Sequence, residues 1–229
     1  MSINEQDPFL LQRGASAELY LIRHGDAIPE ADEIIPSGLY DDLPLSKTGR
    51  EQAQALAARF MHMPFAAAYR SPLERCKETS APLLTALGMS ATVVEDIKEI
   101  HLPRKIELPT LQADDDLVPL SKAIRAAQAE TTRIAAASGT WDAVSDRETS
   151  KDFRRRVVTA LDAIARQHSG ERVLVFTHGG VINAYAAEVL GLERDFFFPC
   201  ANTSITLVRS NGEQRVLYIM NDIAHLKLS

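Results

Sequence analysis

The stretch LYLIRHGDAI, residues 19–28, decides the fold class of this chain. A short apolar run from Glu18 to Arg23 is rich in leucine, isoleucine and tyrosine, which is the pattern of a buried strand. The strand then delivers an arginine, the imidazole of His24 and a glycine, and a glycine lets the backbone turn sharply close to a ligand. The stretch therefore predicts a rigid buried strand that carries functional side chains at its carboxyl end.

Strands and helices alternate along the rest of the chain. The sequence predicts further strands at 65–69, 92–95 and 171–177, and helices at 48–61, 72–87, about 117–138, 149–168 and after Gly180. Two last strands, 204–209 and 214–220, flank an Asn211-Gly212 turn and form a hairpin. The alternation predicts an α/β fold with a mostly parallel sheet, in one domain over 1–229 behind an irregular lead-in of about 1–16.

Local signals place the helix starts and one exposed face. Thr48 with Glu51 predicts a capping box, and Ser71 followed by Pro72 predicts an N-cap and a first helical position. The run Arg154-Arg155-Arg156 is expected to be a solvated face, because its flanking apolar residues occupy the core side of the same helix.

Composition excludes several classes of protein. The chain has 229 residues, 45% hydrophobic residues and a net charge of -6, so it has no electrostatic footprint for nucleic acid. Its two cysteines, Cys76 and Cys200, form neither a disulfide framework nor a four-ligand zinc site. A signal peptide and a membrane-spanning run are both absent from the sequence, so we expect a cytoplasmic protein with no membrane partner. A homo-oligomer stays an open option.

Charged and imidazole side chains follow three of the predicted strands. These are Arg23-His24, Arg70 with Arg75 a turn later, and His178-Gly179-Gly180. Because ligands of open α/β sheets bind at the carboxyl ends of the strands, these groups are expected to meet at one edge. Arginine matches phosphate oxygens, and helix-start N–H groups after the glycines add to anion binding. A metal site of His24, His178 and Asp26 is the alternative, which the neighbouring arginines disfavour by repulsion.

Five segments in this order, LIRHGDA, PLSKTGREQA, SPLERCKETS, VLVFTHGGVINA and NTSITLV, resemble the histidine phosphatase superfamily, which has the phosphoglycerate mutase-like fold. The resemblance runs from about Leu19 to the closing NDIAHL. It implies a three-layer α/β/α arrangement with helices on both faces of the sheet. It also implies an enzyme that needs neither a metal nor another cofactor.

The resemblance assigns roles to the residues above. His24 is the expected nucleophile that carries a phosphohistidine, and His178, with Arg23 and Arg75, is expected to hold the equatorial phosphoryl oxygens. The expected phosphoryl-binding residues are Arg23, Arg75, Gly179, Arg70 and Asn202. At the Arg70 position the family often has serine, so a surface ion pair is an equal alternative for that side chain.

Glu99 occupies the place of the proton donor in the phosphatase branch of the family. The residues that follow it, Ile-His-Leu-Pro-Arg in place of the usual glycine, depart from the family pattern. Glu95 and Asp26 are therefore the alternative proton donors. His101, two residues on, is expected either to line the pocket or to lie on the surface.

The expected function is hydrolysis of a small phosphomonoester. Mutases of the family carry a Glu, a Trp and an Asn soon after the Arg-His-Gly triplet, whereas this chain has Asp26-Ala27-Ile28-Pro29. A mutase, and a phosphate-ligand binding protein with degraded catalysis, are the two alternatives. We expect segment 97–120 to cap the pocket and set specificity, with Arg104 or Lys105 meeting a second anionic group.

Overall fold

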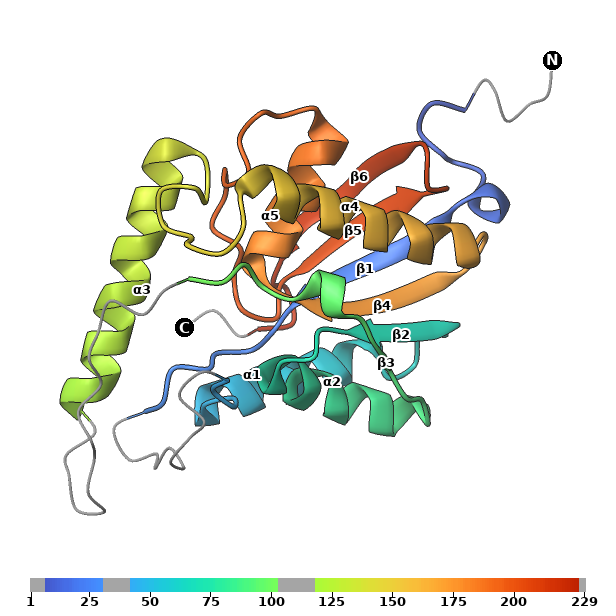
Figure 1. Cartoon of the computed structure of the whole chain (residues 1–229). Helices are drawn as coiled ribbons and strands as arrows, with labels where there is room; N and C mark the ends of the chain where they lie inside the picture. The colour runs from blue at the N-terminus through green and yellow to red at the C-terminus, as the bar shows by residue number, and fades with distance from the viewer. Residues whose placement is uncertain (1–6, 31–41, 103–117, 227–229) are drawn as a thin grey trace.

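A central six-stranded sheet organises the computed structural model, which describes residues 7–30, 42–102 and 118–226 (Figure 1). Its strand order is β3-β2-β4-β1-β5-β6. The strands are β1 (Ala17–Arg23), β2 (Ala67–Arg70), β3 (Thr92–Val93), β4 (Arg172–Thr177), β5 (Ile205–Ser210) and β6 (Arg215–Asp222). The first four are parallel to one another, while β5 and β6 add antiparallel pairs at one edge. The predicted α/β sheet with an edge hairpin is confirmed.

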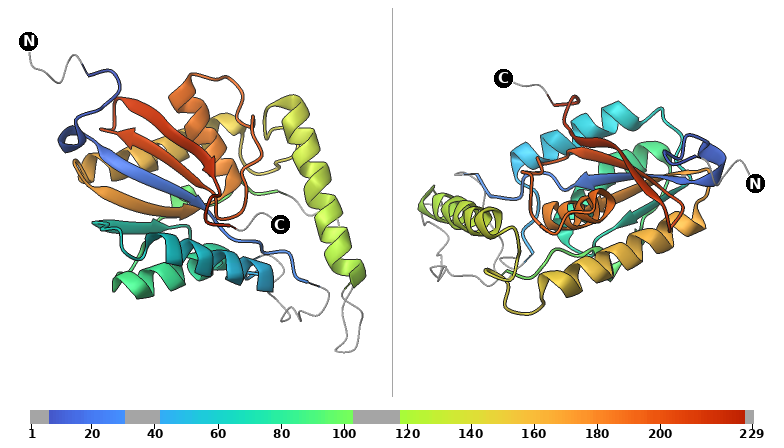
Figure 2. Two further views of the ribbon diagram at one scale, coloured as in Figure 1. Left: turned by 180° about the vertical axis from the view of Figure 1, so that it is seen from behind. Right: turned by 90° about the horizontal axis from the view of Figure 1, so that it is seen from above.

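Helices cover both faces of the sheet, as the two views of Figure 2 show. They are α1 (Lys47–Phe60), α2 (Glu74–Leu87), α3 (Val118–Ser138), α4 (Ser150–Gln167) and α5 (Gly179–Leu190), with single 3-10 turns η2 (Arg13–Ala15) and η3 (Glu95–Ile97). Helices α1 and α2 lie on one face, α4 and α5 on the other, and α3 stands apart at the end toward which β1 points. Within the described ranges no helix is both long enough and apolar enough to cross a membrane.

Alternation along β1 and β4 explains the three layers. Leu19 and Leu21 of β1 belong to the core cluster under α4 and α5, whereas Ile22 belongs to the cluster with α1 and α2. Val175 and Phe176 of β4 divide between the same two clusters. Because side chains of a strand alternate between faces, a central strand buried on both faces reads as one continuous apolar run.

The predicted capping box at the start of α1 is wrong. Ser46 is the N-cap, and its hydroxyl accepts a hydrogen bond of 3.1 Å from the backbone N–H of Gly49. Thr48 lies inside the first turn, where its hydroxyl donates to Glu30 at 2.6 Å. A serine two residues upstream of the threonine satisfies the same helix end, and local spacing does not distinguish the two.

The predicted N-cap of α2 is also wrong, because the helix begins at Glu74 rather than at Pro72. The N-cap residue is Leu73, which makes no side-chain capping bond. Instead, the backbone N–H of Glu74 donates to the carboxylate of Asp42 at 2.9 Å. The hydroxyl of Ser71 has a tertiary partner, described below with the cavity.

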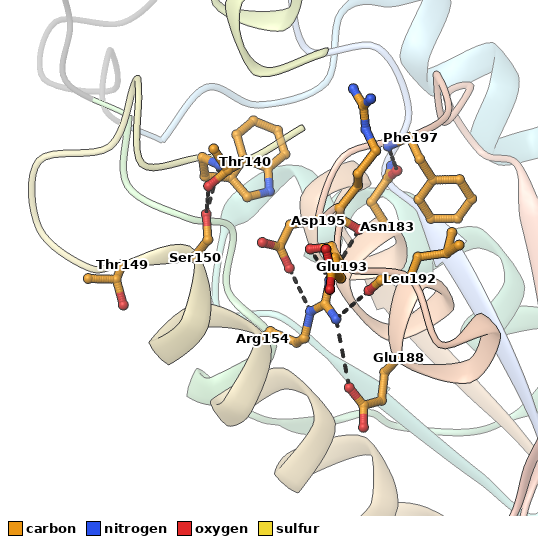
Figure 3. Close-up of polar contacts among 12 residues, drawn as sticks. Thr140, Thr149, Ser150, Arg154, Asn183, Glu188, Leu192, Glu193, Asp195 and Phe197 are labelled. Carbon is orange, nitrogen blue, oxygen red and sulfur yellow. Dashed lines mark hydrogen bonds and ion pairs between the residues drawn. The ribbon is translucent and has the colours of Figure 1, made fainter. Parts of the chain in front are cut away.

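Two of the three consecutive arginines in α4 are not solvated as predicted. Arg154 donates to Asp195 at 2.6 Å and to the backbone carbonyl of Leu192 at 2.7 Å, so it ties α4 to the loop after α5 (Figure 3). Arg156 pairs with Glu148 at 2.6 Å. The long side chains extend from the exposed face to partners distant in sequence, which helical periodicity does not reveal.

Parts of the predicted lead-in and cap segment lie outside the described residues. These are 1–6 of the lead-in and 103–117 of the cap segment, including the candidate anion-binding residues Arg104 and Lys105.

Arg154→Ala is expected to lower the free energy of unfolding by about 2–4 kcal/mol, because it leaves the buried Asp195 carboxylate without its charged partner. Arg155→Ala is the matched control. That side chain is 70% exposed and pairs with Asp152 at 2.7 Å, a surface ion pair, so its loss should stay within about 0.5 kcal/mol. Urea denaturation of both variants measures the difference, and equal losses would contradict the structural role of Arg154.

Candidate active site

The carboxyl ends of β1 and β4 converge on a cavity of about 500 Å³. In the parallel pairing of β1 with β4, Arg23 lies opposite Thr177, so the next residues of both strands emerge side by side. The rings of His24 and His178 are 5.2 Å apart, centre to centre. Arg75, in the first turn of α2, reaches the same cavity. The predicted meeting of two imidazoles and two guanidiniums is therefore present in the fold.

His24 is buried and held in one tautomer. Its Nδ1 lies 2.7 Å from the carbonyl oxygen of Gly25, which can only accept a hydrogen bond. The proton of the neutral ring is therefore on Nδ1, and Nε2 keeps its lone pair. Burial holds the pKa of His24 well below its usual value, and Arg75 and Arg23 lower it further. The imidazole is accordingly neutral at physiological pH, as a nitrogen nucleophile must be.

His178 is fully buried behind His24 and does not itself line the cavity. Its Nε2 shares a hydrogen bond of 2.7 Å with the hydroxyl of Ser71, and its Nδ1 has no partner among the described residues. Burial again lowers its pKa well below the usual value, followed by the effects of Arg75 and His24. Ser71, which the sequence predicts to be the N-cap of α2, thus orients the imidazole of His178.

Two guanidiniums supply the positive charge of the cavity. Arg23 donates one Nη to the carbonyl of Cys200, and its buried Nε has no acceptor within the described ranges. Arg75 lies 3.7 Å from the carboxylate of Asp42 and its side chain is 16% exposed. A buried donor without an acceptor costs free energy, so an anion that accepts from Arg23 would remove that cost.

The side chain of Glu99, which follows η3 in the chain, contacts the N-terminal end of α5. Its carboxylate accepts one hydrogen bond from the backbone N–H of Gly180 and another from that of Ile100, both of 3.1 Å. Burial raises the pKa of Glu99, against the lowering effects of these N–H groups and of Arg75. The sequence predicts that the backbone N–H groups at the start of α5 bind an external anion. In the structure the N–H of Gly180 donates to the Glu99 carboxylate instead.

The alternative proton donors fit the cavity less well. Glu95 is exposed and does not line it. Asp26 lines it, but its carboxylate accepts from the hydroxyl of Ser46 at 2.8 Å and lies 3.6 Å from Arg125. In the described part of the chain, no three His, Cys, Asp or Glu side chains form a group that could hold a metal ion.

The other expected site residues divide into two groups. Gly179 and Asn202 line the cavity, and the Asn202 amide donates to the carbonyl of His24 at 3.1 Å. Arg70 is not in the lining, and its guanidinium donates to the carbonyl of Ser71 at 3.1 Å. His101 is also outside, 39% exposed and paired with Asp146 at 2.8 Å.

Sequence reasoning missed one whole wall of the cavity. The loop after α3 contributes Trp141, and α3 itself contributes Ile124, Ala127, Gln128, Glu130, Thr131, Thr132 and Ile134. Ile124, Ala127, Thr131 and Ile134 are spaced as on one helical face, which is the signal that could have pointed to a buried surface. The partner of that face is set only by the chain path.

Ser71→Ala is expected to leave the buried Nε2 of His178 without its hydroxyl partner. We expect a loss of about 1–3 kcal/mol in the free energy of unfolding and a mixture of His178 tautomers. Nitrogen-15 NMR of the ring measures the tautomer ratio. An unchanged single tautomer would show that Ser71 does not orient the ring.

Gly180→Ala is expected to displace Glu99. A Cβ at position 180 would come within 2.3 Å of the Glu99 carboxylate oxygen, the flexible end of a side chain, so the fold survives while the hydrogen bond breaks. Gly179→Ala is the control, because a Cβ there meets no atom nearer than 3.6 Å. Amide hydrogen exchange at position 180 reports the bond: we expect it to accelerate only in Gly180→Ala.

Two proteins of Arabidopsis thaliana are similar to this chain in sequence. The chain is 28% identical over 214 residues to "Phosphoglycerate mutase-like protein 4" of Arabidopsis thaliana, covering 92% of this chain and 87% of that protein. It is 27% identical over 212 residues to the "Metal-independent phosphoserine phosphatase" of the same plant, covering 91% and 83%.

Solved structures agree on the fold. A phosphoglycerate mutase from Bacillus anthracis superposes with a TM-score of 0.66 at 19% identity, over 93% of this chain and 96% of that one. A phosphoserine phosphatase from Entamoeba histolytica, crystallised with 3-phosphoglyceric acid, gives 0.65 at 20% identity, over 92% and 100%. The model of the histidine phosphatase superfamily (branch 1) matches residues 19–223, and the chain belongs to that superfamily.

Proposed function

We propose that this protein is a phosphomonoesterase that works through a phosphohistidine on His24. The observation that supports this most is the neutral, buried imidazole whose Nδ1 is held by a carbonyl, beside two guanidiniums at the edge of a cavity. A ring nitrogen with a free lone pair and an anion-binding surround are what phosphoryl transfer to histidine requires.

In the proposed first step, Nε2 of His24 attacks phosphorus in line. The N–P bond forms, the P–O bond to the alcohol breaks, and the leaving oxygen takes the proton of Glu99. Arg23 and Arg75 stabilise the charge on the equatorial oxygens. The Nδ1 of His178, which has no partner among the described residues, is the proposed additional donor to them, and this requires an oxygen to reach past the present lining, to which His178 does not belong.

In the second step a water attacks the phosphohistidine from the side that the alcohol has left. The Glu99 carboxylate takes one proton of that water, the N–P bond breaks, and inorganic phosphate leaves. His24 is then neutral again and Glu99 is protonated again. The raised pKa of Glu99 suits a group that must donate a proton in one step and accept one in the next.

The relatives described above include both mutases and phosphatases, which supports phosphoester chemistry. The absence from this chain of the Glu, Trp and Asn that follow the triplet in mutases favours the phosphatase. Product analysis separates them, because a mutase forms an isomer of its substrate without free phosphate. A binding protein would release no phosphate from any ester.

His24→Ala is expected to abolish phosphate release from p-nitrophenyl phosphate in the presence of EDTA, a loss of at least about 1,000-fold, because the nucleophile is removed. His62→Ala, at an exposed histidine of the loop after α1, is the matched control and should keep full activity. Turnover that survives in His24→Ala would overturn the mechanism, and turnover abolished by EDTA would favour a metal site.

Glu99→Gln is expected to lower kcat by about 100-fold or more for an alkyl phosphate, and by less for p-nitrophenyl phosphate, whose leaving oxygen needs no proton. The pH profile follows from the two pKa directions. His24 loses its lone pair as pH falls through its lowered pKa, and Glu99 loses its proton as pH rises through its raised pKa. Wild-type activity should therefore be bell-shaped in pH, with its maximum between the pKa values of these two groups, and the alkaline decline should vanish in Glu99→Gln. An equal loss of kcat with the two esters would show that Glu99 is not the proton donor to the leaving oxygen.

A further inference from the structure

The cavity is much larger than the phosphoryl group requires. Its volume of about 500 Å³ is typical of sites that enclose a whole small molecule. Arg23, His24 and Arg75 occupy only one part of its lining, and the remainder extends to α3 and to the loops on either side of it. The alcohol part of the substrate therefore has a wall of its own.

That wall is mostly apolar, with the polar side chains Gln128, Glu130, Thr131 and Thr132 added from α3. Trp141 and Phe196 are 5% and 9% exposed, and their rings pack edge to face at 5.0 Å. Ile28, Leu102 and Ile134 line the same cavity from three different segments. Each apolar group that a ligand buries against such a wall adds to its affinity, in proportion to the area removed from water.

The charged side chains of the lining also favour a substrate with an uncharged alcohol part. Among the described residues, the cations of the lining are Arg23 and Arg75, and both act on the pKa of His24. The carboxylates of the lining are Asp26, Glu99 and Glu130. Asp26 and Glu130 already lie beside Arg125 and Arg133. The described cations of the lining, Arg23 and Arg75, are at the phosphoryl end, so a carboxylate on the alcohol part would be desolvated against the wall without a charged partner, which is costly.

We infer that the cavity selects phosphomonoesters whose alcohol part is bulky, apolar and uncharged. The inference rests on the proposed hydrolysis and adds the substrate class to it. Thr131, on the cavity face of α3, is the position at which the charge of the wall can be changed without removing an apolar contact.

The first test compares kcat/KM for ethyl, butyl and hexyl phosphate, whose leaving alcohols are chemically alike. We expect a rise of roughly threefold to fourfold per buried methylene. Hexyl phosphate and 6-phosphooxyhexanoate form a matched pair that differs only in the terminal carboxylate, and we expect the neutral ester to be favoured at least tenfold. A flat series, or equal values for the matched pair, would overturn the inference.

The second test changes the wall. Thr131→Arg places a cation in the lining and should reduce the tenfold preference for hexyl phosphate or reverse it. Ala129→Arg adds the same charge to an exposed position of α3 outside the lining, so it should leave the preference unchanged. An equal change in both variants would show that the preference reflects the overall charge of the protein rather than the wall.

Binding of non-hydrolysable ligands separates this inference from the proposed function. Calorimetry with hexylphosphonate and 6-phosphonohexanoate measures the preference of the wild-type cavity without turnover. If no ester releases phosphate but hexylphosphonate binds at least tenfold more tightly, hydrolysis is wrong and the selectivity stands. If esters are hydrolysed through His24 but the phosphonates bind equally, the hydrolysis stands and the selectivity is wrong.

Discussion

The parallel pairing of β1 with β4 is the constraint on which the rest of the cavity depends. The backbone N–H of His24 donates to the carbonyl of Thr177 at 2.9 Å, so the ladder continues to the residue that carries the imidazole. A slip of one residue would turn Leu21 and Val175 to the opposite face of the sheet. The same hydrophobic pattern that sets the core therefore sets the 5.2 Å separation of the two imidazole rings.

The charge at one end of the cavity, where Arg23 and Arg75 lie beside His24, suits an anionic ligand. Two buried imidazoles remain neutral next to two guanidiniums, and burial is the first cause in both cases. Donors such as the Nε of Arg23 are buried without an acceptor among the described residues. Buried polar groups of this kind stabilise the fold less than an apolar core would. Their donors and charges are already in place for an anionic ligand, so little reorganisation is needed when one binds.

Sequence reasoning succeeded where a residue acts through its own strand end. His24 and His178 follow apolar runs that must be buried, and parallel strands bring their carboxyl ends to one edge. It failed where a side chain chooses between a local and a distant partner. Ser71 has the spacing of an N-cap but bonds His178, and Arg154 has the position of a solvated residue but binds Asp195.

Periodicity and residue type by themselves determined the α/β class, the edge hairpin and the strand ends that meet at the cavity, because these follow from short-range burial and turn chemistry. Only the tertiary structure decided that Glu99 contacts Gly180, that Arg70 stays outside the lining, and that α3 forms one wall of the cavity. Those outcomes depend on contacts between segments far apart in the chain. The physical reason is that a side chain's partner is set by the path of the folded backbone, which no local pattern encodes.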